Sequence, residues 1–351
     1  MSLSSHDYVQ TLKGQRLIFP DIDGLFEGWP VGSSPHYDIL RRSQNTQIFK
    51  LLGPGERFDT FVMADPALLA SMWCPHSSLD ALSLASAIVS FFFVWDDEMD
   101  SPEFGDTSSD FEAGERFRGT TVAHLKSYLD EGFPGSSDRP GQSEKLIASF
   151  NPVAELARSL LPHDRQQQLI KEAVDFVLSV GCEQQAELSG DIPNIEEYMR
   201  FRLRSSGVAV VFLTIECLAQ VNLGDEIRND TDFQKLGEEA NRIIFLVNDV
   251  LSLKKELKFP FYCNAVAILY HKHQNLQVAV EKVYHMVAGS VGRLNGAVAR
   301  LLARYPDRRS DLEAVVCTIK TMCTGNITWS QAIQRYGLDV DKLDGTTSIT
   351  L

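Results

Sequence analysis

Apolar residues recur along most of this chain with the three- and four-residue spacing of an amphipathic helix, and polar segments separate these runs. We expect helices at about 66–73, 81–100, 111–130, 143–160, 164–188, 231–257, 275–304, 308–323 and 328–336, one that starts at Asn194 with a break at Ser205-Ser206-Gly207, and one capped by Asn264. No segment shows the two-residue alternation of a strand. The pattern therefore predicts an all-α chain.

The Gly- and Pro-rich residues 1–35 are expected to form an N-terminal strap, and residues 341–351 a C-terminal tail. No segment between them is a strong linker, so we expect a single domain over 1–351. With 351 residues, 44% of them hydrophobic, the chain can bury a large core. Its net charge of −14 argues against nucleic acid and against an anionic membrane surface as partners.

Cysteine usage and the N-terminal residues bear on the compartment. The six cysteines form no Cys-x-x-Cys pair, and most lie in apolar helical stretches, as expected of buried, reduced thiols. The first residues lack the pattern of a secretory signal peptide. The apolar run 207–221 is interrupted by polar residues and is too short to span a bilayer. We expect a soluble, cytoplasmic protein.

Five bulky apolar residues at 91–95 lead directly into four acids, Asp96, Asp97, Glu98 and Asp100. Pro102 disfavours helix at the residue before it, so the acids should occupy the last helical turn. Acids at this negative end cost about 0.3–1 kcal/mol each, which a bound cation would offset. Asp96 and Asp100 share a face, and hard carboxylate oxygens suit Mg²⁺. A solvated acidic helix end is the alternative.

A second polar group interrupts the apolar stretch 243–256. Asn248, Ser252 and Glu256 are four residues apart and lie within about 80° on one side of a helix, where their oxygens can chelate one small hard cation. Buried polar groups without partners are costly, so the alternative is a polar network between helices. We expect this flank and the acidic helix end to face each other across one pocket.

Together these motifs resemble those of class I terpene synthases of the microbial, single-domain, sesquiterpene type. The family's DDxxD motif corresponds to 96–100, and its (N/D)DxxSxx(K/R)E motif to 248–256. The family's Arg-Tyr pair near the C-terminus corresponds to Arg335-Tyr336, and Trp329 lies seven residues before Tyr336. The diphosphate sensor corresponds to Arg202, which lies 46 residues before Asn248 and four after Tyr198. The likeness covers about residues 55–340 and implies an α-helical bundle around a central apolar cavity.

One position departs from the family pattern. The family often has Asp three residues after the sensor, where this chain has Ser205, and the family's effector carbonyl would fall at Ser206.

The resemblance implies an allylic isoprenoid diphosphate as substrate, favouring farnesyl diphosphate, and three Mg²⁺ ions. Asp96 would bridge two ions, Asp100 would assist directly or through water, and Asp97 would hold an Arg or Lys. Asn248, Ser252 and Glu256 would bind the third ion. Hydrogen bonds to the diphosphate would come from Arg202, Lys255, Arg335 and Tyr336. Phe92, Phe93 and Trp329 would line the cavity and stabilise the carbocation, unless they are simply core residues.

Three other functions remain open. A diterpene cyclase acting on geranylgeranyl diphosphate would carry the same motifs. A chain-elongating prenyl transferase has two Asp-rich motifs, and here the second is replaced by the Asn248, Ser252 and Glu256 set. A non-catalytic helical scaffold would not need intact motifs at both sites. Members of the family are often dimers, so a homodimer is also expected.

Overall fold

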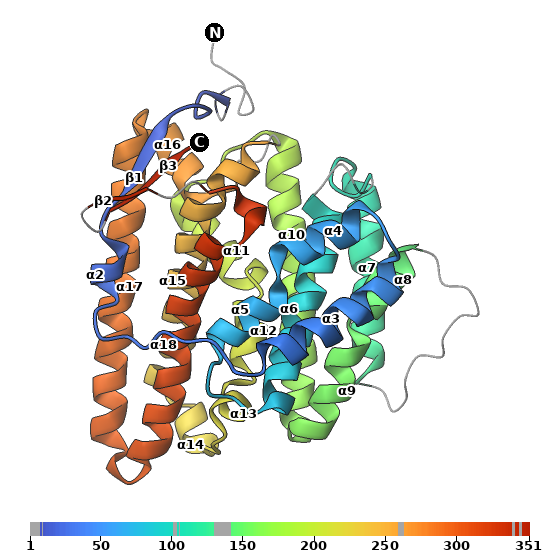
Figure 1. The fold of residues 1–351 in the computed structure, drawn as a ribbon, viewed down its shortest axis with the longest axis vertical. Coiled ribbons are helices and arrows are strands. Elements are labelled where there is room, and N and C mark those ends of the chain that lie inside the picture. Colours follow the sequence, from blue (N-terminus) through green and yellow to red (C-terminus); the bar gives the residue numbers. More distant parts are fainter. Residues whose placement is uncertain are drawn as a thin grey trace. The chain divides into compact units, whose positions relative to one another are not determined.

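The computed structural model describes residues 8, 10–100, 104, 106–129, 142–258, 263–338, 341–343 and 346–351. Two compact units make up the fold, and each is described by itself (Figure 1). Unit 1 comprises residues up to Gly32, Ala186–Leu203 and Leu223–Leu351, and unit 2 comprises Ser33–Gln185 and Arg204–Asn222. The prediction of a single domain stays a prediction.

Unit 2 is helical. Its elements are α3 (Tyr37–Leu52), α4 (Glu56–Ala64), α5 (Pro66–Trp73), α6 (Leu79–Asp100), α7 (Phe111–Ser127), α8 (Gln142–Ala148), α9 (Asn151–Leu160), most of α10 (His163–Ser189), α12 (Val208–Phe212) and α13 (Ile215–Ala219). Helix α6 contacts α3, α4, α5, α8, α9, α12 and α13, and so forms the centre of this unit. Residues 130–141, between α7 and α8, lie outside the described residues.

Helix α6 is central because it is apolar on nearly all sides. Phe91 and Trp95 are fully buried, as expected of packing residues, and Trp95 Nε1 donates to Thr121 Oγ1 of α7 at 3.0 Å. By length and composition α6 could cross a membrane, but 61% of its most apolar stretch is buried, as in a core helix. Such a single helix is weak evidence of a membrane span.

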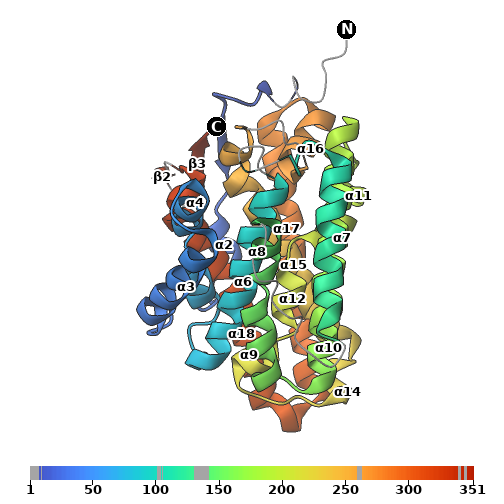
Figure 2. The same ribbon diagram turned by 90° about the vertical axis from the view of Figure 1, so that its right-hand side faces the viewer.

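Unit 1 is built on three long helices that lie side by side in Figures 1 and 2. Helix α15 (Thr231–Glu256) contacts α17 (Leu276–Arg304), α18 (Arg309–Ala332) and the shorter α16 (Ala265–His273). The other elements are α2 (Ile22–Leu25), most of α11 (Ile195–Ser205), α14 (Asp225–Arg228), η1 (Pro306–Arg308) and η2 (Gln334–Tyr336). The expected break between 323 and 328 was wrong, because α18 continues through buried Gly325 and Asn326.

A small antiparallel sheet joins the two ends of the chain in unit 1. Its strands are β1 (Arg16–Phe19), β2 (Asp341–Leu343) and β3 (Thr346–Thr350), in the order β1-β3-β2. Leu17 pairs with Ile349, and both side chains are buried. The strands have only three to five residues, too few for their alternation to be distinguished in the sequence. The helical class predicted from the sequence is otherwise confirmed.

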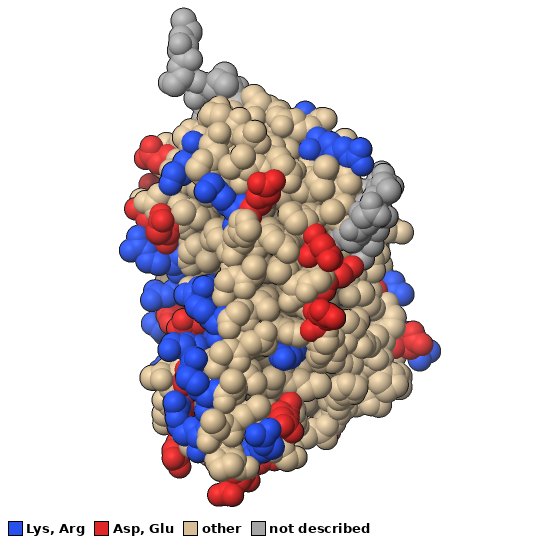
Figure 3. Space-filling model, turned by 90° about the vertical axis from the view of Figure 1, so that its left-hand side faces the viewer, with Lys and Arg blue, Asp and Glu red and all other residues tan. Residues whose placement is uncertain are grey.

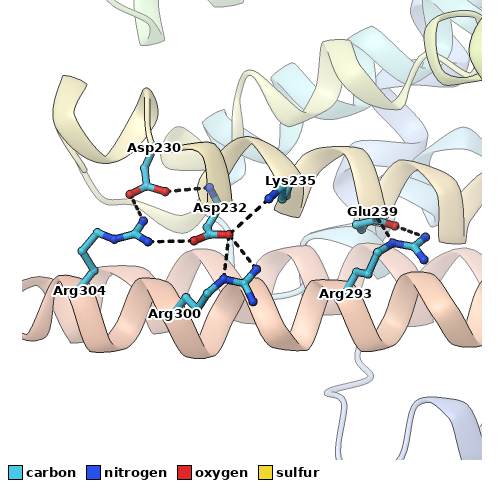
Figure 4. Close-up of polar contacts among 7 residues, drawn as sticks. All are labelled: Asp230, Asp232, Lys235, Glu239, Arg293, Arg300 and Arg304. Atoms are coloured by element: carbon cyan, nitrogen blue, oxygen red, sulfur yellow. Dashed lines mark hydrogen bonds and ion pairs between the residues drawn. The ribbon is translucent and has the colours of Figure 1, made fainter.

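Ion pairs along the contact between α15 and α17 form what we call the α15–α17 ladder: Asp230, Asp232 and Glu239 with Arg293, Arg300 and Arg304 (Figure 4). Arg293 binds Glu239 through two hydrogen bonds of 2.8 Å, and Arg300 binds Asp232 at 2.8 Å. Basic side chains form a vertical band on the left of the surface in Figure 3. The ladder holds the N-terminal half of α15 against α17.

The ladder changes the acidity of its three carboxyl groups. Hydrogen bonds from Arg300 are the main cause that lowers the pKa of Asp232, and burial opposes them. Burial would raise the pKa of Asp230 and of Glu239, but the arginine hydrogen bonds outweigh it, so both pKa values are lowered. All three groups are therefore carboxylates at neutral pH.

Candidate active site

The acidic motif occupies the end of α6 in unit 2. Helix α6 runs to Asp100, so all four acids lie in its last turns, as the sequence predicts. Asp96 and Asp97 are half-buried and Asp100 is exposed. Ser101 and Pro102, on which the predicted helix end rested, lie outside the described residues.

Phe92 and Phe93 lie one turn before the acids and are half-buried. The ring of Phe92 packs 4.3 Å from the ring of Phe176 on α10, measured between centroids. The Phe92 ring also lies close to Gly207, where an added Cβ would be 2.8 Å from it. Phe92 is therefore held between α10 and the start of α12.

Gly207 lies at the helix break that the sequence predicts. Helix α11 ends at Ser205, and Gly207 has φ of +74° and caps the N-terminus of α12. Ser205 is buried and donates a hydrogen bond to Glu183, while Ser206 Oγ accepts one from the backbone N–H of Val208 at 3.3 Å. The role of the Ser206 carbonyl as effector stays a prediction.

The second motif lies on α15 in unit 1, and hydrogen bonds orient each of its three side chains. Asn248 Nδ2 donates to the Tyr336 hydroxyl at 2.7 Å, which leaves the amide oxygen as the acceptor. Ser252 Oγ donates to Glu256 Oε1 at 2.6 Å, so these two oxygens lie side by side. Asn264 Nδ2 holds the other oxygen of Glu256 at 2.8 Å.

Asp249, the second residue of this motif, has a different role. It is buried, and its carboxylate accepts hydrogen bonds from the Tyr198 hydroxyl of α11 at 2.6 Å and from the backbone N–H of Ala265 at 2.9 Å. Burial raises the pKa of Asp249 to about 7, although the charge of Arg202 and these hydrogen bonds oppose the rise. Asp249 thus joins α11, α15 and α16.

Two of the expected diphosphate-binding residues of unit 1, Arg335 and Arg202, act on Tyr336 through their charges. Burial raises the pKa of Tyr336 to about 12, although the charges of Arg335 and Arg202 and the hydrogen bond with Asn248 oppose the rise. The ring of Trp329 meets the Tyr336 ring edge-on, with centroids 5.6 Å apart. Lys255 and Arg335 are half-buried.

Sequence reasoning missed two supporting residues. Asn264 was expected only as a helix cap, which it is, but it also binds Glu256. Tyr198 was used only to find Arg202, and it holds Asp249. Asn264 lies eight residues after Glu256, and nothing in the sequence links the two.

The residues of α15 fit a magnesium ion. Asn248, Ser252 and Glu256 offer an amide, a hydroxyl and a carboxylate oxygen, and such hard donors suit Mg²⁺ rather than a soft metal. Among the described residues no group of three or more His, Cys, Asp or Glu side chains is placed to hold a metal. An Asn/Ser/Glu set would not form such a group. The two motifs lie in different units, so their facing each other across one pocket stays a prediction.

Comparison with known proteins identifies the family. Residues 87–293 match the family model for terpene synthase family 2, C-terminal metal binding, and this range contains both motifs. Sesquiterpene cyclase hepA of Aspergillus oryzae is 25% identical over 91% of this chain and 88% of its own. Terpene cyclase braA of Annulohypoxylon truncatum is 24% identical over 92% of this chain and 86% of its own.

Solved structures show the same fold. A linalool/nerolidol synthase from Streptomyces clavuligerus, in complex with 2-fluorogeranyl diphosphate, has a TM-score of 0.72 at 17% identity, over 87% of this chain and 97% of its own. Hedycaryol synthase in complex with HEPES has a TM-score of 0.69 at 20% identity, over 87% and 96%.

The chain belongs to the terpene synthase family. It is a class I terpene synthase, a lyase acting on an isoprenyl diphosphate, and its family implies a divalent metal.

Proposed function

We propose that this protein is a magnesium-dependent sesquiterpene cyclase that ionises farnesyl diphosphate, cyclises the carbocation to a terpene hydrocarbon or alcohol and releases diphosphate. The observation that carries the proposal is the set of oriented oxygens on α15, where Tyr336, Ser252 and Asn264 hold Asn248 and Glu256 through hydrogen bonds of 2.6–2.8 Å. Farnesyl diphosphate is favoured because hepA is named a sesquiterpene cyclase.

In this proposal Asn248, Ser252 and Glu256 hold one Mg²⁺ ion, and Asp96 and Asp100 hold two more. Bound metal would stabilise the negative charge that develops on the diphosphate as the carbon–oxygen bond breaks. Arg202, Lys255, Arg335 and Tyr336 donate hydrogen bonds to the diphosphate oxygens, and Asp97 holds a basic side chain.

The hydrocarbon part of the substrate needs a dry apolar site, because water would quench the carbocation. Phe92, Phe93 and Trp329 would present aromatic faces to it, each stabilising the cation by about 1–2 kcal/mol when water is excluded. Ser206 would offer its carbonyl at the helix break before Gly207.

The proposal is tested by incubating the protein with Mg²⁺ and the C10, C15 and C20 prenyl diphosphates, followed by gas chromatography of the extract. A cyclic C15 product formed only with the metal is expected. A cyclic C20 product alone would instead make the protein a diterpene cyclase. A longer prenyl diphosphate formed in a parallel incubation with added isopentenyl diphosphate, and detected as its alcohol after phosphatase treatment, would make it a prenyl transferase.

A non-catalytic scaffold is distinguished by thermal unfolding. Inorganic diphosphate with Mg²⁺ should raise the unfolding temperature of a cyclase, and a scaffold should show no rise.

We further propose a cytoplasmic, single-domain protein that binds neither nucleic acid nor membrane and forms a homodimer. Sedimentation of the purified protein tests the dimer.

A further inference from the structure

The acidic motif has one side chain that faces away from the proposed metal ligands. Asp100 lies about 40° round α6 from Asp96, whereas Glu98 lies about 200° from it, on the opposite side. Glu98 is buried, at 6% exposure, although it is charged and belongs to the last turn of the helix. A buried carboxylate needs a partner.

Arg57, in the first turn of α4, is that partner. Its guanidinium donates one hydrogen bond to Glu98 Oε2 and another to the backbone carbonyl of Phe104. It also lies over the Phe104 ring, 4.8 Å from the centroid. One side chain thus joins α4, the last turn of α6 and the chain that follows it, all within unit 2.

Local helix stability does not explain this pair. Arg57 is a cation at the positive end of α4, and Glu98 is an anion at the negative end of α6, so each is unfavourable in its own helix. Pairing them offsets both. What the pair adds is a fixed position for the end of α6.

A second contact fixes the same turn. The last carbonyls of a helix have no partner within it, and the Thr107 hydroxyl donates to the Glu98 carbonyl. The carbonyl of Thr107 in turn accepts a hydrogen bond of 2.5 Å from Gln184 Nε2 on α10. The end of α6 is therefore held through both its side chain and its backbone.

We infer that Arg57 is a positioning residue for the metal-binding carboxylates of α6, acting through Glu98. The inference rests on the proposed function, because it takes Asp96 and Asp100 as metal ligands. Groups that hold metal ligands in place change metal affinity by about 10- to 100-fold when they are removed. Arg57 does not touch the metal or the substrate in this scheme.

The test compares Arg57→Met with Arg41→Met. Arg41 is a matched control because it also makes one ion pair, with Asp65 at 3.2 Å, and one ring contact, with Tyr37 at 5.9 Å, in the same unit. The unfolding temperature is measured during a Mg²⁺ titration at constant inorganic diphosphate. The Mg²⁺ concentration at which half of the rise in unfolding temperature is reached, called the Mg²⁺ midpoint, should increase about tenfold or more in Arg57→Met. It should stay unchanged in Arg41→Met.

Two further variants and one further measurement complete the design. Arg57→Lys keeps the charge but loses the forked contact, and should give an intermediate midpoint. Thr107→Val removes only one hydroxyl, and these two variants carry the test if Arg57→Met does not fold. Hydrogen exchange of the amides of residues 95–100 in metal-free protein should show lost protection in Arg57→Met and not in Arg41→Met.

A folded Arg57→Met with the wild-type Mg²⁺ midpoint would overturn the inference. So would an equal change in Arg41→Met, because it would indicate a general loss of stability. If the wild type itself shows no Mg²⁺ response, the proposed function fails and the role of Arg57 toward the metal fails with it. Hydrogen exchange would then still decide whether Arg57 anchors the end of α6.

Discussion

Gly207 is the position where a single methyl group should disturb both the fold and the product. It sits at the helix break with φ of +74°, a conformation that side chains other than Gly rarely adopt. A Cβ there would lie 2.8 Å from two ring atoms of Phe92. The ring cannot simply withdraw, because Phe176 packs 4.3 Å from it.

The cost of Gly207→Ala has two parts. The left-handed backbone costs about 1–2 kcal/mol for a residue with a Cβ. Overpacking against the Phe92 ring adds about 1–3 kcal/mol. Gly190 separates the two parts, because it has φ of +75° and no atom within 4 Å of an added Cβ. We expect a loss of about 2–5 kcal/mol in Gly207→Ala and about 1–2 kcal/mol in Gly190→Ala.

Urea denaturation followed by circular dichroism measures both free energies of unfolding, and gas chromatography measures the product mixture. The Gly207→Ala enzyme should also change its products, because Phe92 must shift. Adding Phe92→Leu should recover part of the loss in stability. Equal losses in Gly207→Ala and Gly190→Ala, with no recovery, would refute the argument from the Phe92 contact.

Other predictions concern α17, acid stability and the chemistry. Gly292→Ala should raise the free energy of unfolding by about 1 kcal/mol, because its added Cβ meets open space. Gly289→Ala should raise it by less, because its Cβ would lie 3.1 Å from the Arg293 side chain. Urea denaturation of both variants measures the difference. The carboxyl groups of the α15–α17 ladder have lowered pKa values, so the unfolded chain takes up their protons first. Their stabilisation is therefore complete only above about pH 5, well above the unfolded pKa values, and it disappears as the pH falls through the native values. Acid titration followed by ellipticity should show this loss, and an acid unfolding transition that is unchanged in Arg293→Met would contradict it. Asn248→Ala should stay folded and release no diphosphate, so that measurable turnover would disprove the metal assignment. Phe93→Ala should alter the product mixture more than substrate affinity. An unchanged product mixture would show that Phe93 is a core residue that does not line the cavity.

Local patterns made much of the fold predictable. The helical stretch that carries the acids up to Asp100 follows from the apolar pattern before it, and the break before Gly207 follows from the Ser-Ser-Gly sequence. The strands at the chain ends were not predictable. They pair Arg16 with Thr350, and a pairing across more than three hundred residues leaves no periodic signal in either segment.

In the candidate site, too, the sequence predicted the features that lie within one helix but not the contacts between elements. Helical spacing placed Asn248, Ser252 and Glu256 on one side of α15, because residues four apart on a helix share a face. The partners that orient them come from other elements, Tyr336 from η2 and Asn264 from the start of α16. Spacing within one helix carries no information about such neighbours.

By itself the sequence determined the helical class, the two motifs and the enzyme family, because each depends on residue type and spacing along one segment. Only the tertiary structure showed that Asp249 is a buried residue whose hydrogen bonds connect helices, and that Arg57 binds Glu98. Both are acids within recognisable motifs, and the chain alone does not separate them from metal ligands. What separates them is the direction each carboxylate faces and the donor it meets, and these are fixed by packing between segments far apart in the chain.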